Sequence, residues 1–118
     1  MAAEKKNPNR IEKINALLQK LVGIILLNTL EKSLGLVTVS KVETSRDMKY
    51  SKIWISILNG NDDKILKIIE QNIYHIQGEI NRRLPIKIIP KVKFFLDTSP
   101  RYVQHIDELI KKIHETGD

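Results

Sequence analysis

The chain has 118 residues and no cysteine, so its size suits one domain and its fold cannot depend on disulfide bonds or cysteine-bound zinc. Hydrophobic residues make up 42% of it and charged residues 29%, a balance that excludes a disordered chain. The longest apolar run, Leu21 to Leu27, is far shorter than the roughly 20 residues that cross a bilayer. Because the N-terminus also lacks a signal peptide's hydrophobic region, we expect a cytoplasmic protein with no membrane partner.

The chain is basic, with a net charge of +6. The excess lies in residues 1–60, which hold ten Lys and Arg against five Asp and Glu, whereas the second half is nearly neutral. Such an excess favours binding to polyanions such as nucleic acids, but it also occurs in proteins whose basic residues only keep them in solution. Charge alone therefore leaves both interpretations open.

A long amphipathic helix is predicted at the start of the chain. Asn7 can cap it with Pro8 in the first helical position, and apolar residues then recur every three or four positions. We expect this helix to reach about Ser33, with Gly35 as its C-terminal stop.

Two strands should follow, joined by a hairpin. The hydrophobic period changes to two from Leu36, and a second strand is predicted to begin near Lys52. Residues 44–50 between them suit a hairpin connection. The second strand has an apolar face made of Ile53, Ile55 and Ile57.

The second half predicts a long helix, a third strand and a last helix. An apolar stripe at helical spacing runs from Ile65 to Leu84, and Pro85 ends it. After Pro90 a strand alternates apolar residues with Lys91, Lys93 and Phe95, so its outer face should be basic and aromatic. A final helix is expected after Pro100. This order predicts a two-layer α+β domain over residues 1–118, with a three-stranded sheet packed against helices.

The sequence offers little for catalysis. The histidines, His75, His105 and His114, lie far apart in the sequence, and no glycine-rich phosphate loop occurs. Ser45 could be a nucleophile, but next to Asp47 it is more typical of a hydrogen-bonded turn. We therefore predict no enzymatic activity, no cofactor, no metal and no small-molecule substrate.

Trp54 allows two interpretations. Strand alternation places it opposite Ile53 and Ile55, on the less buried face of the sheet. It could stack on a base or on the protein's own termini, and the structural role is favoured because a single aromatic lacks the paired aromatics of an RRM.

Basic residues form the strongest candidate for a binding site. Some belong to the hairpin and the strand after it, and the others lie on the long helix or just beyond it, so together they could line a groove that holds RNA phosphates first and reads bases second. They are Arg46, Lys49, Lys52, Lys64, Lys67, Arg82, Arg83 and Lys87.

Several strings in this order resemble the ribosome-binding factor A family over essentially the whole chain. Residues 37–48, VTVSKVETSRDM, are similar to the family's valine-rich strand followed by S-x-D-L. Residues 52–57, KIWISI, resemble its second strand, and residues 83–90, RLPIKIIP, continue the match. Residues 91–99, KVKFFLDTS, resemble the family's P-x-L-x-F-x-x-D-x-S segment together with the preceding Pro90.

The resemblance implies a type II KH-like fold with the order α-β-β-α-α-β-α and no enzymatic activity. It implies binding to the small (30S) ribosomal subunit and a role in late maturation of 16S rRNA, often important in the cold. In the family a helix-kink-helix carries A-x-G, and those positions fall at Asn72 and Tyr74 here, which adds both residues to the candidate RNA contacts. A general KH-like module for single-stranded RNA is the alternative, and we expect a monomer in either case.

Overall fold

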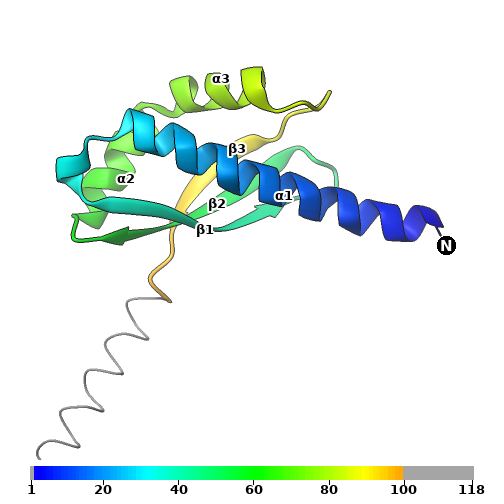
Figure 1. The fold of residues 1–118 in the computed structure, drawn as a ribbon, viewed down its shortest axis with the longest axis horizontal. Coiled ribbons are helices and arrows are strands. Elements are labelled where there is room, and N and C mark those ends of the chain that lie inside the picture. The colour runs from blue at the N-terminus through cyan, green and yellow to red at the C-terminus, as the bar shows by residue number, and fades with distance from the viewer. Residues whose placement is uncertain (1, 100–118) are drawn as a thin grey trace, which may run out of the picture.

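The computed structural model describes the backbone of residues 2–99 and the side chains of residues 10–99. Its elements are α1 (Ala2–Thr29), the 3-10 helix η1 (Lys32–Leu34), β1 (Leu36–Thr44), β2 (Tyr50–Leu58), α2 (Asp62–Gln71), α3 (Ile73–Arg83) and β3 (Lys91–Leu96). Figure 1 shows the helices packed on the sheet. The predicted α+β architecture and its three strands are confirmed. The predicted last helix, with His105 and His114, lies outside the described residues.

The first helix differs from the prediction at both ends. It begins at Ala2 rather than at Pro8, so the proline lies inside the helix and not at its first position. It ends at Thr29 rather than near Ser33. In its last turn the Thr29 hydroxyl donates to the Ile25 carbonyl at 2.7 Å. The chain then continues through η1 to Gly35, whose φ of 117° is open to glycine but strained for other residues.

The sheet has the order β1-β2-β3, with β2 in the centre. The strands β1 and β2 are antiparallel and joined by the predicted hairpin, whereas β3 runs parallel to β2. A parallel neighbour requires a crossover, which α2 and α3 provide. The second strand starts at Tyr50, slightly earlier than expected.

A bulge in β1 keeps its valines on the inner face. Strict alternation from Val37 and Val39 would turn Lys41 inward, but the register shifts between Val39 and Lys41. Val42 is buried as a result and Lys41 is exposed. The Ser40 hydroxyl at the bulge donates to the Asp97 carboxylate at 2.7 Å, which ties β1 to the end of β3 across the sheet.

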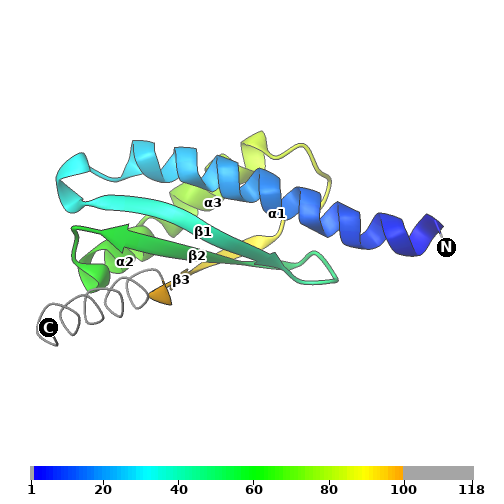
Figure 2. The ribbon, with the colours of Figure 1, turned by 60° about the horizontal axis from the view of Figure 1, so that its bottom comes forward.

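The core lies between one face of the sheet and the helices. In Figure 2 the helices lie on one side of the sheet and leave its other face uncovered among the described residues. Fully buried isoleucines from β2, α2 and α3 meet leucines and valine of α1. Among them are Leu18, Val22, Leu26, Ile53, Ile55, Ile65, Ile69, Ile76 and Ile80.

Candidate nucleic-acid interface

The β1–β2 hairpin holds two of the predicted cations at one end of the sheet. Its turn is closed by the Ser45 backbone, whose N–H donates to the Tyr50 carbonyl at 2.8 Å, and by the Ser45 hydroxyl, which donates to Asp47 at 2.6 Å. The pKa of Asp47 is lowered, first by this hydroxyl and then by the Lys49 backbone N–H. The predicted hydrogen-bonded turn at Ser45 is confirmed, and it leaves Arg46 and Lys49 exposed.

Lys87 comes to the same end of the molecule. The chain that follows α3 returns to start β3 beside the hairpin, where the Lys91 N–H donates to the Lys49 carbonyl at 2.9 Å. Lys87 lies in this returning segment, four residues before Lys91, and is exposed. Lys49 and Lys87 therefore belong to segments that meet at one end of the sheet.

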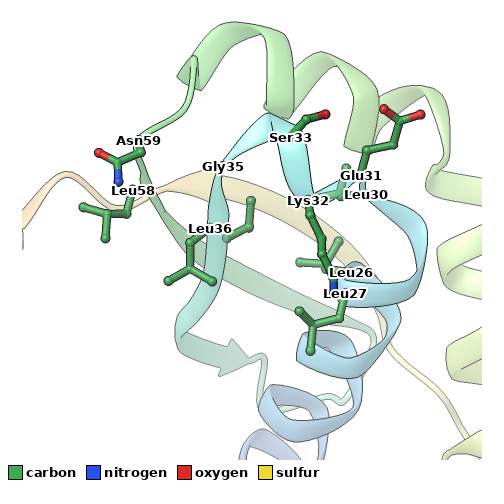
Figure 3. Close-up of a pocket in the computed structure, with 11 residues that line it drawn as sticks. Leu26, Leu27, Leu30, Glu31, Lys32, Ser33, Gly35, Leu36, Leu58 and Asn59 are labelled. Carbon is green, nitrogen blue, oxygen red and sulfur yellow. The ribbon is translucent and has the colours of Figure 1, made fainter.

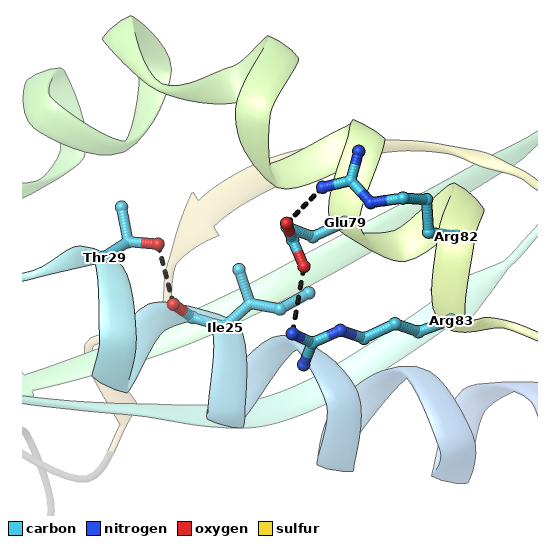
Figure 4. A network of polar contacts seen from close by, with 5 residues as sticks. All are labelled: Ile25, Thr29, Glu79, Arg82 and Arg83. Atoms are coloured by element: carbon cyan, nitrogen blue, oxygen red, sulfur yellow. Dashed lines mark hydrogen bonds and ion pairs between the residues drawn. The ribbon is translucent and has the colours of Figure 1, made fainter.

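Arg82 and Arg83 end α3, and both are paired. Their guanidinium groups point toward the carboxylate of Glu79, Arg82 by a short contact and Arg83 at 3.1 Å (Figure 4). The pKa of Glu79 is lowered, chiefly by the hydrogen bond from Arg82. The cluster has a net charge of +1, so it offers RNA less positive charge than the two arginines alone suggest.

Lys64 and Lys67 lie at the other end of the sheet. They belong to α2, which begins directly after β2 ends, capped by Asn61 through a 3.0 Å bond from the Lys64 N–H. The nine residues of β2 span about 30 Å, which separates these lysines from the hairpin. The structure thus does not bring Lys64 and Lys67 into one groove with Arg46 and Lys49.

The helix break implied by the resemblance is present at Asn72. This residue adopts φ −103° and ψ 14°, and α2 and α3 leave it in different directions (Figure 1). Its side-chain amide donates to the Ile68 carbonyl at 2.8 Å. Tyr74 does not need glycine's left-handed conformation, since it lies within α3 and has no positive φ. With 91% of its surface exposed, Tyr74 stands out at the break.

The outer face of the sheet carries aromatic and basic residues. Of these, only Lys52 was among the RNA contacts predicted from the sequence. Trp54 and Phe95 are direct neighbours on β2 and β3, with ring centroids 5.1 Å apart. The ammonium groups of Lys52 and Lys93 lie 5.8 Å and 5.7 Å from the Phe95 centroid. The alternation of β3 predicted a basic and aromatic face, but the pairing of Phe95 with Trp54 depends on the parallel register, which no local pattern encodes.

A pocket of about 460 Å³ lies apart from these cations. Figure 3 shows it between the end of α1, the start of β1 and the end of β2, with Leu27, Leu36 and Leu58 among its lining residues. Its lining is mostly apolar, with Glu31 and Lys32 as its charged members.

The described residues assemble no metal centre or nucleophile site. Within residues 10–99, no group of three His, Asp or Glu side chains could hold a metal ion, and His75 lies exposed on α3. Ser45 donates to the carboxylate of Asp47, which is a turn contact. No helix in the part of the chain that the structure describes has the length and hydrophobicity to span a membrane.

Comparison with known proteins places the chain in a family. A sequence model described as ribosome-binding factor A matches residues 10–110. The chain belongs to the ribosome-binding factor A family. A ribosome-binding factor A from Thermodesulfovibrio yellowstonii is 35% identical over 111 residues, covering 92% of this chain and 94% of that protein. Another, from Ligilactobacillus salivarius, is 32% identical and covers 91% of this chain and 93% of the relative.

Solved structures of family members share the fold. The crystal structure of ribosome-binding factor A from Thermus thermophilus aligns with a TM-score of 0.66 at 16% identity, over 73% of this chain and 93% of that one. A solution structure of a Thermotoga maritima protein, described as a putative ribosome-binding factor A, aligns with a TM-score of 0.58 at 24% identity, over 73% and 85%. These likenesses confirm the fold that the resemblance implied.

Proposed function

We propose that the protein is an assembly factor that binds the small (30S) ribosomal subunit and assists late maturation of 16S rRNA. The observation that carries this proposal is the family match over residues 10–110, supported by the basic surface described above. A model of the Thermus thermophilus relative, which aligns here with a TM-score of 0.62, was fitted into a cryo-electron-microscopy map of a 30S complex. That complex is a property of the relative, and the proposal extends it to this chain.

The contacts to RNA are proposed to come from both ends of the sheet. At the hairpin end, Arg46, Lys49 and Lys87 are exposed and form no salt bridge with any described residue. At the other end, Lys64 and Lys67 lie on α2, and the break between the helices presents Asn72 and Tyr74. Lys52, Arg82 and Arg83 complete the proposed set, with the two arginines held by Glu79.

The proposed mechanism is occupancy rather than catalysis. A bound protein biases rRNA toward one conformation only if it binds the immature and mature subunits with different affinity. The same difference releases it once the subunit has matured. This mechanism needs no cofactor and no small-molecule substrate, and it suits a monomeric single domain that acts in the cytoplasm.

Binding to purified ribosomal subunits tests the proposal. The protein should bind small subunits more tightly than large subunits or free tRNA, and its affinity should fall steeply as salt rises, because phosphate contacts release counterions. Subunits from cells arrested in late assembly should bind more tightly than mature ones. Equal affinity for all of these RNAs would contradict the proposal. Equal affinity for unstructured oligonucleotides and small subunits would instead favour the general single-stranded RNA module.

A pair of variants tests the hairpin contacts. Lys49→Ala should weaken binding to small subunits and reduce the slope of log affinity against log salt by about one. Lys20→Ala is the matched control, since Lys20 is an exposed cation on α1 and not in the proposed set. If both variants lose the same affinity, only net charge matters and the hairpin is not a contact.

A further inference from the structure

The outer face of β2 and β3 repeats one arrangement along the strands. Tyr50 lies beside Lys91, Lys52 beside Lys93, and Trp54 beside Phe95, all as direct partners in the parallel register. Aromatic rings and ammonium groups thus alternate over one surface, and Tyr50 is 60% exposed. We call these residues the β2–β3 strip: Tyr50, Lys52, Trp54, Lys91, Lys93 and Phe95.

The strip places like charges next to each other. Lys52 and Lys93 are cross-strand partners and both are exposed. Like charges directly opposite each other on neighbouring strands destabilise a sheet. The contact of both ammonium groups with the Phe95 ring offsets part of this repulsion. Glu43, across from Lys52 on β1, pairs with Lys41 at 2.9 Å and attracts Lys52 more weakly. A bound anion between Lys52 and Lys93 would relieve the remaining repulsion.

The chemistry of the strip fits one occupant. Its lysines can bind a polyanion, and flat groups can stack on the partly exposed rings of Trp54 and Phe95. Single-stranded RNA supplies both, because its phosphates and unpaired bases alternate along one chain. A duplex keeps its bases stacked on each other, and a second copy of this face would bring lysines against lysines.

We propose that the β2–β3 strip is a second RNA contact surface, on which unpaired bases stack on Trp54 and Phe95 while phosphates lie between Lys52, Lys91 and Lys93. The surface lies on the side of the sheet opposite to α2 and α3 (Figure 2). The proposal rests on the proposed function only in taking RNA as the polyanion. It assigns contact roles to Phe95, Lys91 and Lys93, none of which belongs to the set of RNA contacts proposed above.

Fluorescence of Trp54 reports this contact directly, because it is the one tryptophan in the chain. Titration with an oligouridylate of about ten nucleotides should quench Trp54 in a saturable, salt-dependent way, whereas an RNA duplex of equal length should quench little. Phe95→Leu should lower the affinity for the oligonucleotide by about five- to 150-fold, which is the cost of losing one stacked base. Leu27→Ala removes an exposed apolar side chain on α1, outside both proposed contact sets, and should leave the titration unchanged.

Lys93→Glu separates a binding role from a structural one. It replaces the repulsion by Lys52 with an attraction, so the variant should melt at a higher temperature than the wild type while binding the oligonucleotide more weakly. Lys93→Ala should reduce the salt slope by about one. If Lys93→Glu loses thermal stability and affinity together, the residue is only structural and the proposal fails.

The outcomes also separate this inference from the proposed function. The protein could bind small subunits tightly while Trp54 is not quenched and Phe95→Leu binds as the wild type does. This outcome would overturn the proposed role of the strip and leave the assembly role intact. Quenching by oligouridylate with no preference for small subunits would support the strip and overturn the assembly role. Quenching that persists with unchanged affinity in Phe95→Leu would show that no base stacks on Phe95, which contradicts the proposed contact.

Discussion

Gly60, between β2 and α2, has no room for a side chain. A Cβ placed there would meet the Leu34 carbonyl, with Ile65 and Ile57 carbons at 2.8 Å and 2.9 Å. Gly60→Ala should therefore lower the free energy of unfolding by about 1–3 kcal/mol, the usual cost of overpacking. Gly78→Ala is the matched control, because its nearest neighbour is 3.8 Å away and alanine favours the helix by about 1 kcal/mol. Urea denaturation measures both, and equal effects would contradict the packing at Gly60.

Asp97 makes the stability of the sheet depend on pH. Its carboxylate accepts hydrogen bonds from the Ser40 hydroxyl at 2.7 Å and the Ser99 N–H at 3.0 Å, and the Ser40 bond is the first cause of its lowered pKa. Because the folded state favours the charged form, this stabilisation is present above the unfolded pKa of 3.8 and is lost as pH falls through the lower folded value.

Ser40→Ala should therefore cost about 1 kcal/mol of unfolding free energy at neutral pH. The difference from wild type should shrink when urea denaturation is repeated at successively lower pH below 3.8, as Asp97 becomes protonated in the folded state. A cost that does not change with pH would mean that Ser40 acts through its bond to the Trp54 carbonyl at 3.2 Å instead.

The break between α2 and α3 does not follow from the spacing of their apolar residues. Ile69 and Ile76 are seven residues apart, within about 20° of two full turns of an ideal helix, so an unbroken helix would also hold both on one face. Both residues are buried, on either side of the irregular residue Asn72. The break also needs no glycine at the family's glycine position, since Tyr74 stands there within α3 and has no positive φ.

Asn72→Ala tests what the side chain adds to the break. The variant loses the amide bond to the Ile68 carbonyl and should lose about 1 kcal/mol of unfolding free energy. The core isoleucines on both sides should still hold the break, so the slope of stability against urea should not change. A gain in stability would show instead that the bond is worth less than the helix propensity of alanine.

Elements with one dominant local pattern could be predicted from the sequence. The alternation of Ile53, Ile55 and Ile57 gave β2 correctly because one of its faces is fully buried. Arrangements that depend on distant residues could not. The bulge that keeps Val42 inside and the parallel register that joins Trp54 to Phe95 are fixed by the packing of whole strands. The candidate site divided in the same way: the local pattern placed Arg46 and Lys49 in the hairpin, but it could not show that the length of β2 separates Lys64 from them.

The charge of the whole molecule should act mainly on the rate of encounter with RNA. Its net charge of +6 attracts the polyanionic subunit at long range, and salt screens this attraction. The contacts that hold the bound state are short-ranged, so salt weakens them less. The association rate constant with immobilised small subunits should therefore fall more steeply with salt than the dissociation rate constant rises. Lys20→Ala should slow association slightly and leave dissociation unchanged, because Lys20 adds to the field without lying in a proposed contact. By contrast, Lys49→Ala should also speed dissociation. Salt dependence found only in dissociation would show that long-range attraction plays no part.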